Sequence, residues 1–171
     1  MLIELIVRYS KTPNILFLIF FFSATQVLAD EGLEIEIDNP KFSEKGLDNR
    51  LYEIKAERGI QRENDLELFG VEGKLRTDSG IWIYLNSDQG NFNQLNNLIE
   101  LHGNIIFYTN ENEKLQSDNA IFNMDKDLVN FSNNVKHTKG GNVITSDESK
   151  VQNNFDHIIY RGSVNAIFVV E

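Results

Sequence analysis

The chain has 171 residues, with 26 Asp or Glu against 16 Lys or Arg, so its formal net charge is −10. Its length suits one domain of ordinary size, and a hydrophobic content of 41% with 12 Phe is sufficient for a packed apolar interior. The absence of Cys excludes disulfides, Cys-based metal sites and cysteine nucleophiles. The acidic balance argues against nucleic-acid binding, because phosphate contacts require clustered Lys and Arg.

Residues 1–29 have the pattern of a targeting segment. Two basic residues precede an uninterrupted apolar run at residues 15–22, and residues 27–29 (Val-Leu-Ala) resemble a signal-peptide cleavage site. If the segment is retained, the 17 residues 12–28 form an N-terminal membrane anchor. As a helix they span about 25 Å, near the lower limit for a bilayer core of about 30 Å. Both alternatives place an exported domain at residues 30–171.

The exported part alternates in the manner of β-strands and shows no convincing helical period. Leu33-Glu34-Ile35-Glu36-Ile37 alternates strictly, and Pro40 ends this first strand. Turn-forming Asn, Asp, Gly and Ser separate the later segments. The pattern predicts an antiparallel meander of about eight or nine strands.

An internal repeat is the most informative feature. The dipeptide Ser-Asp recurs at intervals of 30 and 29 residues, and a Gly or Asn follows each Ser by sixteen residues. These positions are Ser87-Asp88 with Gly103, Ser117-Asp118 with Asn133, and Ser146-Asp147 with Gly162, and an earlier unit has Gly73. Apolar residues keep register four and two positions before, and two positions after, each Gly or Asn, so they share one face of a strand.

Each repeat predicts a bent strand. Gly inside a strand marks a bulge or a bend. After each repeated Asp, the alternation of apolar and polar residues is offset by one position, so the apolar side chains move to the other face of a regular strand. The recurrence of Asp88, Asp118 and Asp147 indicates a turn or bulge role through local side-chain hydrogen bonds. An antiparallel sheet must cover its apolar face, either by folding over as a sandwich or jelly roll, or by leaving a groove between two sheets.

Five stretches resemble the LptC family of lipopolysaccharide-export proteins, within the LptA/OstA-like superfamily. They are Asp38-Asn39-Pro40-Lys41-Phe42, Leu51-Tyr52-Glu53-Ile54-Lys55-Ala56-Glu57, Gly80-Ile81-Trp82-Ile83, Leu98-Ile99-Glu100-Leu101-His102-Gly103-Asn104-Ile105 and Tyr160-Arg161-Gly162-Ser163-Val164. The similarity covers roughly residues 33–170, and it is carried by the order and spacing of the stretches.

The resemblance implies an all-β, antiparallel open β-jelly roll at residues 30–171, in the periplasm, and lipid transport rather than catalysis. Such proteins receive lipopolysaccharide from an inner-membrane ABC transporter and pass it to the next, LptA-like jelly roll. The apolar residues on the inward face of the repeated strands, which we call the inward row, would then line a lipid-binding groove. Its residues are Phe69, Val71, Ile99, Leu101, Phe107, Val129, Phe131, Ile158 and Tyr160. Two alternatives stay open, an LptA-like soluble bridge unit, favoured by cleavage after Ala29, and a structural β-repeat protein with a closed core.

Exposed edge strands are the second predicted functional surface, because a partner strand can extend a sheet there. We expect the C-terminal strand, residues 164–170, to face the next bridge protein, and the N-terminal strand, residues 33–37, to face the transporter. Gly162 matches a family glycine at the C-terminal edge. The predicted edge residues are Gly162, Val164, Ala166 and Phe168. An ordinary strand end is the alternative for each.

No catalytic or metal-binding motif is present. His102, His137 and His157 have no Cys, His or carboxylate at a recognised ligand spacing. His102 and His157 are predicted on polar faces, and His137 at the mouth of the groove. We expect a protein that is not an enzyme and that requires no metal or cofactor.

Overall fold

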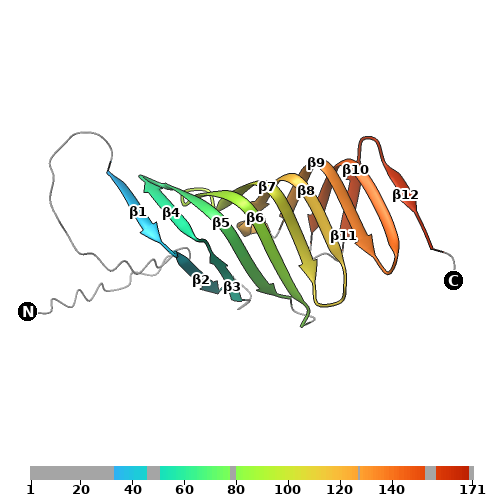
Figure 1. The fold of residues 1–171 in the computed structure, drawn as a ribbon, viewed down its shortest axis with the longest axis horizontal. Helices are drawn as coiled ribbons and strands as arrows, with labels where there is room; N and C mark the ends of the chain where they lie inside the picture. The colour runs from blue at the N-terminus through green and yellow to red at the C-terminus, as the bar shows by residue number, and fades with distance from the viewer. Residues whose placement is uncertain (1–32, 46–50, 78–79, 127, 153–156, 170–171) are drawn as a thin grey trace, which may run out of the picture. The chain divides into compact units, whose positions relative to one another are not determined.

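The computed structural model describes residues 33–45, 51–77, 80–126, 128–152 and 157–169. Within these residues the chain forms one antiparallel sheet of 12 strands, shown in Figure 1, and a single 3-10 turn at Met124–Lys126. The predicted all-β, antiparallel fold is therefore confirmed. The predicted signal peptide or anchor at residues 1–29 lies outside the described residues. In the part of the chain that is described, we find no helix of the length and hydrophobicity needed to cross a membrane.

The strands follow one another in sequence along most of the sheet. They are β1 (Glu34–Asp38), β2 (Lys41–Lys45), β3 (Leu51–Lys55), β4 (Arg58–Arg62), β5 (Asp65–Arg76), β6 (Trp82–Asn93), β7 (Leu98–Thr109), β8 (Lys114–Asn123), β9 (Leu128–Lys139), β10 (Asn142–Gln152), β11 (His157–Arg161) and β12 (Asn165–Ile167). The order across the sheet is β1-β4-β5-β6-β7-β8-β9-β10-β11, with β2 beside β3, β3 also beside β5, and β12 beside β10.

Three pairs of short strands act as single bent strands. Strands β4 and β3 pair with the first and second parts of β5, while β1 and β2 pair with β4 and β3. Likewise β11 and β12 pair with the two parts of β10. Together with the long strands β5 to β10, these three pairs make nine bent strands, in agreement with the predicted eight or nine.

The bends divide the sheet into two parts, which we call half-sheets A and B. Half-sheet A contains β1, β4, β11 and residues 65–69, 89–93, 98–102, 119–123, 128–132 and 148–152 of the long strands. Half-sheet B contains β2, β3, β12 and residues 72–76, 82–86, 105–109, 114–117, 135–139 and 142–145. The register shifts between the two parts in the pairs β6–β7, β7–β8, β8–β9 and β9–β10.

The corner of each repeat is built by the repeated Asp. Asp88 Oδ2 accepts a hydrogen bond from Asn104 Nδ2 at 2.8 Å, across the bulge that Gly103 opens with φ +76°. The second repeat has the same contact, from Asn134 Nδ2 to Asp118 Oδ2 at 2.6 Å. In the third repeat Asp147 Oδ2 accepts instead from the Ser163 backbone N–H, at 2.8 Å. The predicted bulges are therefore confirmed, but the Asp bonds cross between strands to residues sixteen positions away rather than acting locally. The local bonds come from the repeated Ser, whose hydroxyl donates to the backbone carbonyl two residues on.

The apolar core lies between the inward faces of the two half-sheets. Phe107 of half-sheet B meets Phe131 of half-sheet A edge to face, with ring centroids 4.9 Å apart. The largest fully buried side chains are Phe131, Leu66, Leu68, Ile99, Leu101, Ile105, Leu115, Val71 and Val135. They belong to the single apolar cluster between the half-sheets.

The predicted bend of the first unit is misplaced, and Phe69 is assigned to the wrong face, whereas Val71, Gly73 and Leu75 face inward as predicted. The residue with positive φ there is Gly70, at +62°, three positions before Gly73. Phe69, predicted to point inward, therefore alternates with the buried Leu68 and lies on the outer face, where the Arg58 guanidinium sits 4.2 Å from its ring centroid. Glu57 packs against Gly70 in place of the repeated Asp. A Cβ added at Gly70 would lie only 2.8 Å from the Glu57 carboxyl carbon, so this position requires Gly.

Candidate functional site

All residues of the predicted inward row except Phe69 lie between the two half-sheets. Its members on the long strands are buried, with exposed fractions from 0% to 7%, and its two members on β11 are half-buried. The buried members are Val71, Ile99, Leu101, Phe107, Val129 and Phe131, and the half-buried ones are Ile158 and Tyr160. Burial is what both a packed core and a closed lipid groove require, so the row alone does not define a site.

A cavity of about 50 Å³ lies between the half-sheets, at the strand ends away from the corners, and it is partly open to solvent. We call it the mouth cavity. Half-sheet B contributes Tyr52, Glu53, Ile54, Gly73, Lys74, Leu75, Ile83, Leu85 and Phe107, and half-sheet A contributes Phe122, Val129 and Val151. Its walls are apolar, as expected for a site that takes an apolar ligand, since Glu53 and Lys74 occupy strand positions that alternate with the inward ones.

The sequence identified only Phe107 and Val129 of these lining residues. Phe122 and Val151 could have been identified from the sequence, because they occupy the alternating apolar positions that follow the bulge. Tyr52 and Ile54 lie before the first repeat unit, so the repeat spacing does not predict which face of the strand they occupy. Tyr52 closes the cavity against the opposite half-sheet, with its ring centroid 6.2 Å from that of Phe122.

Glu53 lies on the strand β3 that forms one wall of the mouth cavity, and its carboxylate is held by two ion pairs. The Glu53 carboxylate accepts from Lys41 Nζ at 3.1 Å and from Lys74 Nζ at 3.2 Å. The hydrogen bond from Lys41, followed by that from Lys74, lowers the pKa of Glu53 below its ordinary value. These ion pairs lie on the outward face of half-sheet B, behind the cavity wall that Tyr52 and Ile54 form.

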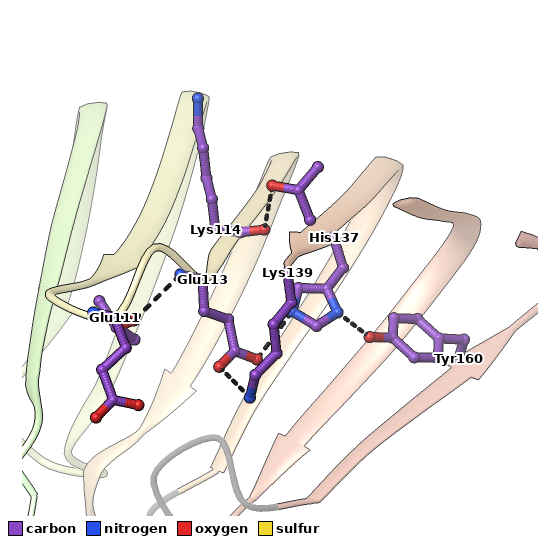
Figure 2. Close-up of polar contacts among 8 residues, drawn as sticks. Glu111, Glu113, Lys114, His137, Lys139 and Tyr160 are labelled. Carbon is purple, nitrogen blue, oxygen red and sulfur yellow. Dashed lines mark hydrogen bonds and ion pairs between the residues drawn. The ribbon is translucent and has the colours of Figure 1, made fainter. Parts of the chain in front are cut away.

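A polar cluster joins the half-sheets near the start of β8 and the end of β9 (Figure 2). His137 Nε2 lies 2.9 Å from Glu113 Oε1, and Lys139 Nζ lies 2.8 Å from Glu113 Oε2. On the other side of the imidazole, His137 Nδ1 is hydrogen-bonded to the Tyr160 hydroxyl. The cluster links β9 of half-sheet B to β11 of half-sheet A. His137, predicted at the mouth of the groove, lies two residues from the end of β9, is 7% exposed and does not line the mouth cavity.

The protonation states of this cluster follow from its hydrogen bonds. Burial raises the pKa of Glu113, but the hydrogen bonds from His137 and Lys139 outweigh it, so the net shift is downward. Since a carboxylate only accepts, His137 Nε2 carries a proton, and in the neutral imidazole Nδ1 accepts from the Tyr160 hydroxyl. Burial, reinforced by the charge of Glu113, raises the pKa of Tyr160 to about 12, so that the hydroxyl remains a donor.

Replacing Glu113 by Gln is expected to lower the free energy of unfolding by about 1–2 kcal/mol at pH 7, because a charge-assisted pair is lost. A folded-state pKa below 4.5 stabilises the fold above that pH, and this contribution disappears as pH falls through the folded pKa. Urea unfolding at pH 7 and pH 3 checks this. The difference between wild type and Glu113→Gln should shrink at pH 3, whereas exposed Glu111→Gln should stay within about 0.5 kcal/mol of wild type throughout. An equal deficit at both pH values would contradict the assigned ionisation of Glu113.

The C-terminal edge is exposed and apolar. Val164 and Phe168 have 50% and 65% of their surfaces exposed, and Ala166 and Gly162 are exposed beside them. Among the described strands β11 and β12 pair only with β10, and β1 pairs only with β4, so the predicted edges lie at the edges of the sheet. The C-terminal strand is shorter than predicted, Asn165–Ile167. Gly162 has a local role, since at φ +83° a Cβ there would lie 2.6 Å from Asp147 Cβ.

The remaining titratable groups do not form a metal centre within the described ranges, where no group of three or more His, Asp or Glu converges. His102 is exposed and contacts Asn119 at 2.9 Å, and His157 is exposed on β11. No family model matches the chain, and no curated protein matches it.

Proposed function

We propose that this protein carries lipopolysaccharide as an LptC-like bridge component with an open β-jelly-roll fold. In this proposal it acts in the periplasm, held at the inner membrane through residues 12–28, or soluble there if those residues are removed. It receives lipopolysaccharide from an inner-membrane ABC transporter and passes it to an LptA-like jelly roll joined by edge-strand addition. The observation that carries the proposal is the mouth cavity, which has apolar walls and lies where the two half-sheets are not joined by corners.

Acyl-chain burial would supply the attraction. Each buried CH₂ contributes roughly 0.8 kcal/mol, whereas a net charge of −10 does not favour an anionic lipid. A cavity of about 50 Å³ has room for water, which needs roughly 10–15 Å³ on the same measure, but it is far smaller than an acyl chain. Loading therefore requires the half-sheets to separate at the mouth, while the Asp-centred corners hold the opposite side together.

A closed structural β-repeat is the second candidate, and one observation favours it. The buried part of the inward row is 0–7% exposed, as in an ordinary core. The two candidates differ in whether a lipid reaches the mouth cavity, and only the carrier requires this.

Site-specific photo-crosslinking from Phe122 separates the two candidates. Phe122 lines the cavity, and p-benzoylphenylalanine retains its aromatic shape, while neighbouring Ile121 is 43% exposed on the outer face and serves as the matched control. In cells whose envelope contains lipopolysaccharide, we expect a lipopolysaccharide adduct from position 122 at least several-fold above that from position 121. Equal adducts, or none in a folded and exported protein, would favour the closed repeat.

A further inference from the structure

The outward face of half-sheet B carries a cross-strand row of aromatic and cationic side chains. Lys74 pairs with Tyr84, Tyr84 with Tyr108, and Tyr108 with Lys114, on four neighbouring strands. Directly opposed residues share one face of a sheet, so these four side chains lie side by side. The row continues through Thr138 and Val143 to Ile167, which is 61% exposed.

The aromatic residues of this face stack on one another. The rings of Tyr84 and Tyr108 are 5.0 Å apart with 18° between their planes, and Trp82 stacks on Tyr84 at 6.5 Å. The Arg76 guanidinium lies 5.8 Å from the Trp82 ring centroid. Because the ring faces are turned toward each other, the row offers solvent its ring edges and hydroxyl tips rather than open ring faces.

This face is basic in a protein that is acidic overall. Its outward positions among the described residues carry six cations, Lys41, Lys55, Lys74, Arg76, Lys114 and Lys136, against two carboxylates, Glu53 and Glu72. Those carboxylates are paired with Lys41, Lys74 and Lys55. Lys114 points away from the Glu113–His137 cluster, as Figure 2 shows, and within the described residues neither Lys114 nor Lys136 has a carboxylate partner.

We propose that the outward face of half-sheet B docks on the surface of an anionic lipid bilayer. Trp and Tyr favour the membrane–water interface because one part of each ring is apolar and the other polar. Lysines beside them attract anionic headgroups over about one Debye length, roughly 8 Å at physiological salt, so the acidic charges elsewhere on the protein are screened. A sugar ligand fits less well, since it would need an open aromatic face on which to stack. The inference is independent of the proposed cargo.

Trp82 provides the measurement, because it is the only Trp in the chain. The full chain is mixed with vesicles of brominated phosphatidylcholine, with or without an equal part of brominated phosphatidylglycerol, and Trp82 quenching is followed. We expect quenching and a blue shift only with the anionic vesicles, with both lost in 1 M salt, where the Debye length falls to about 3 Å.

Charge-matched variants locate the surface. A lysine near an anionic membrane contributes about 1 kcal/mol, equivalent to roughly fivefold in affinity, so Lys114→Gln/Lys136→Gln should require about 25-fold more lipid for half-maximal quenching. Lys150→Gln/Arg161→Gln, which removes two charges from outward positions of half-sheet A, should change it by less than twofold.

Three results would overturn the inference. They are equal quenching by neutral and anionic vesicles, an equal effect of the two double variants, and a shift of Trp82 emission by millimolar inorganic phosphate without vesicles. The last result would mean that the face binds free phosphate rather than a membrane surface.

Discussion

Replacing Gly103 by Ala should lower the free energy of unfolding by about 3 kcal/mol. A non-Gly residue at positive φ costs roughly 1–2 kcal/mol, and crowding in a packed site adds about 1–3 kcal/mol. Both apply here, because Gly103 has φ +76° and a Cβ would lie 2.6 Å from Asp88 Oδ2. Urea unfolding followed by Trp82 fluorescence measures the loss.

Gly140 is the matched control for the crowding at this corner. It has φ +55°, but no atom lies within 4 Å of a Cβ built there, so Gly140→Ala should cost only about 1 kcal/mol. Gly103→Asn should be milder than Gly103→Ala, since Asn133 occupies the equivalent corner with φ +62°. Equal losses for the Ala variants at positions 103 and 140 would show that the Asp-centred corner does not constrain the fold.

Replacing Phe131 by Ala should cost about 3–5 kcal/mol, the loss typical of a large buried aromatic side chain. Phe131 is 1% exposed and meets Phe107 across the two half-sheets. Phe168→Ala, at a residue with 65% of its surface exposed, should change stability by less than about 0.5 kcal/mol. The two variants remove the same atoms, so chemical denaturation compares only their environments. A small loss at Phe131 would mean that the half-sheets are not packed there, and that the groove extends deeper than the mouth cavity.

The repeated units were predictable because local chemistry determines each corner. The Ser-Asp pair and the Gly or Asn that follows it both recur at intervals of about 30 residues. The offset in the apolar alternation beside each pair locates the bulge. The first unit was misplaced because Glu57 replaces the Asp and lies thirteen residues before Gly70, whereas fifteen separate Asp88 from Gly103. Gly73 fits the repeat spacing, because it lies thirty residues before Gly103, but it pairs with Leu85 in a part of β5 that has no bulge.

The site was harder to predict, because it depends on how the half-sheets meet. Phe122 and Phe131 are both inward-facing aromatics in sequence, and only the packing across the interior places one at the mouth and the other in the core. The Glu113–His137 pair joins residues 24 apart through the register of β8 with β9. The aromatic row of half-sheet B likewise needs the register of four strands before its members become neighbours.

Crosslinking from position 122 shows whether the mouth cavity admits a lipid. A lipid carrier should give a lipopolysaccharide adduct from Phe122, which lines the cavity, and little from Ile121, which points outward on the same strand. Adducts of equal yield at positions 121 and 122, or no lipid adduct at position 122 in a folded protein, would contradict this function.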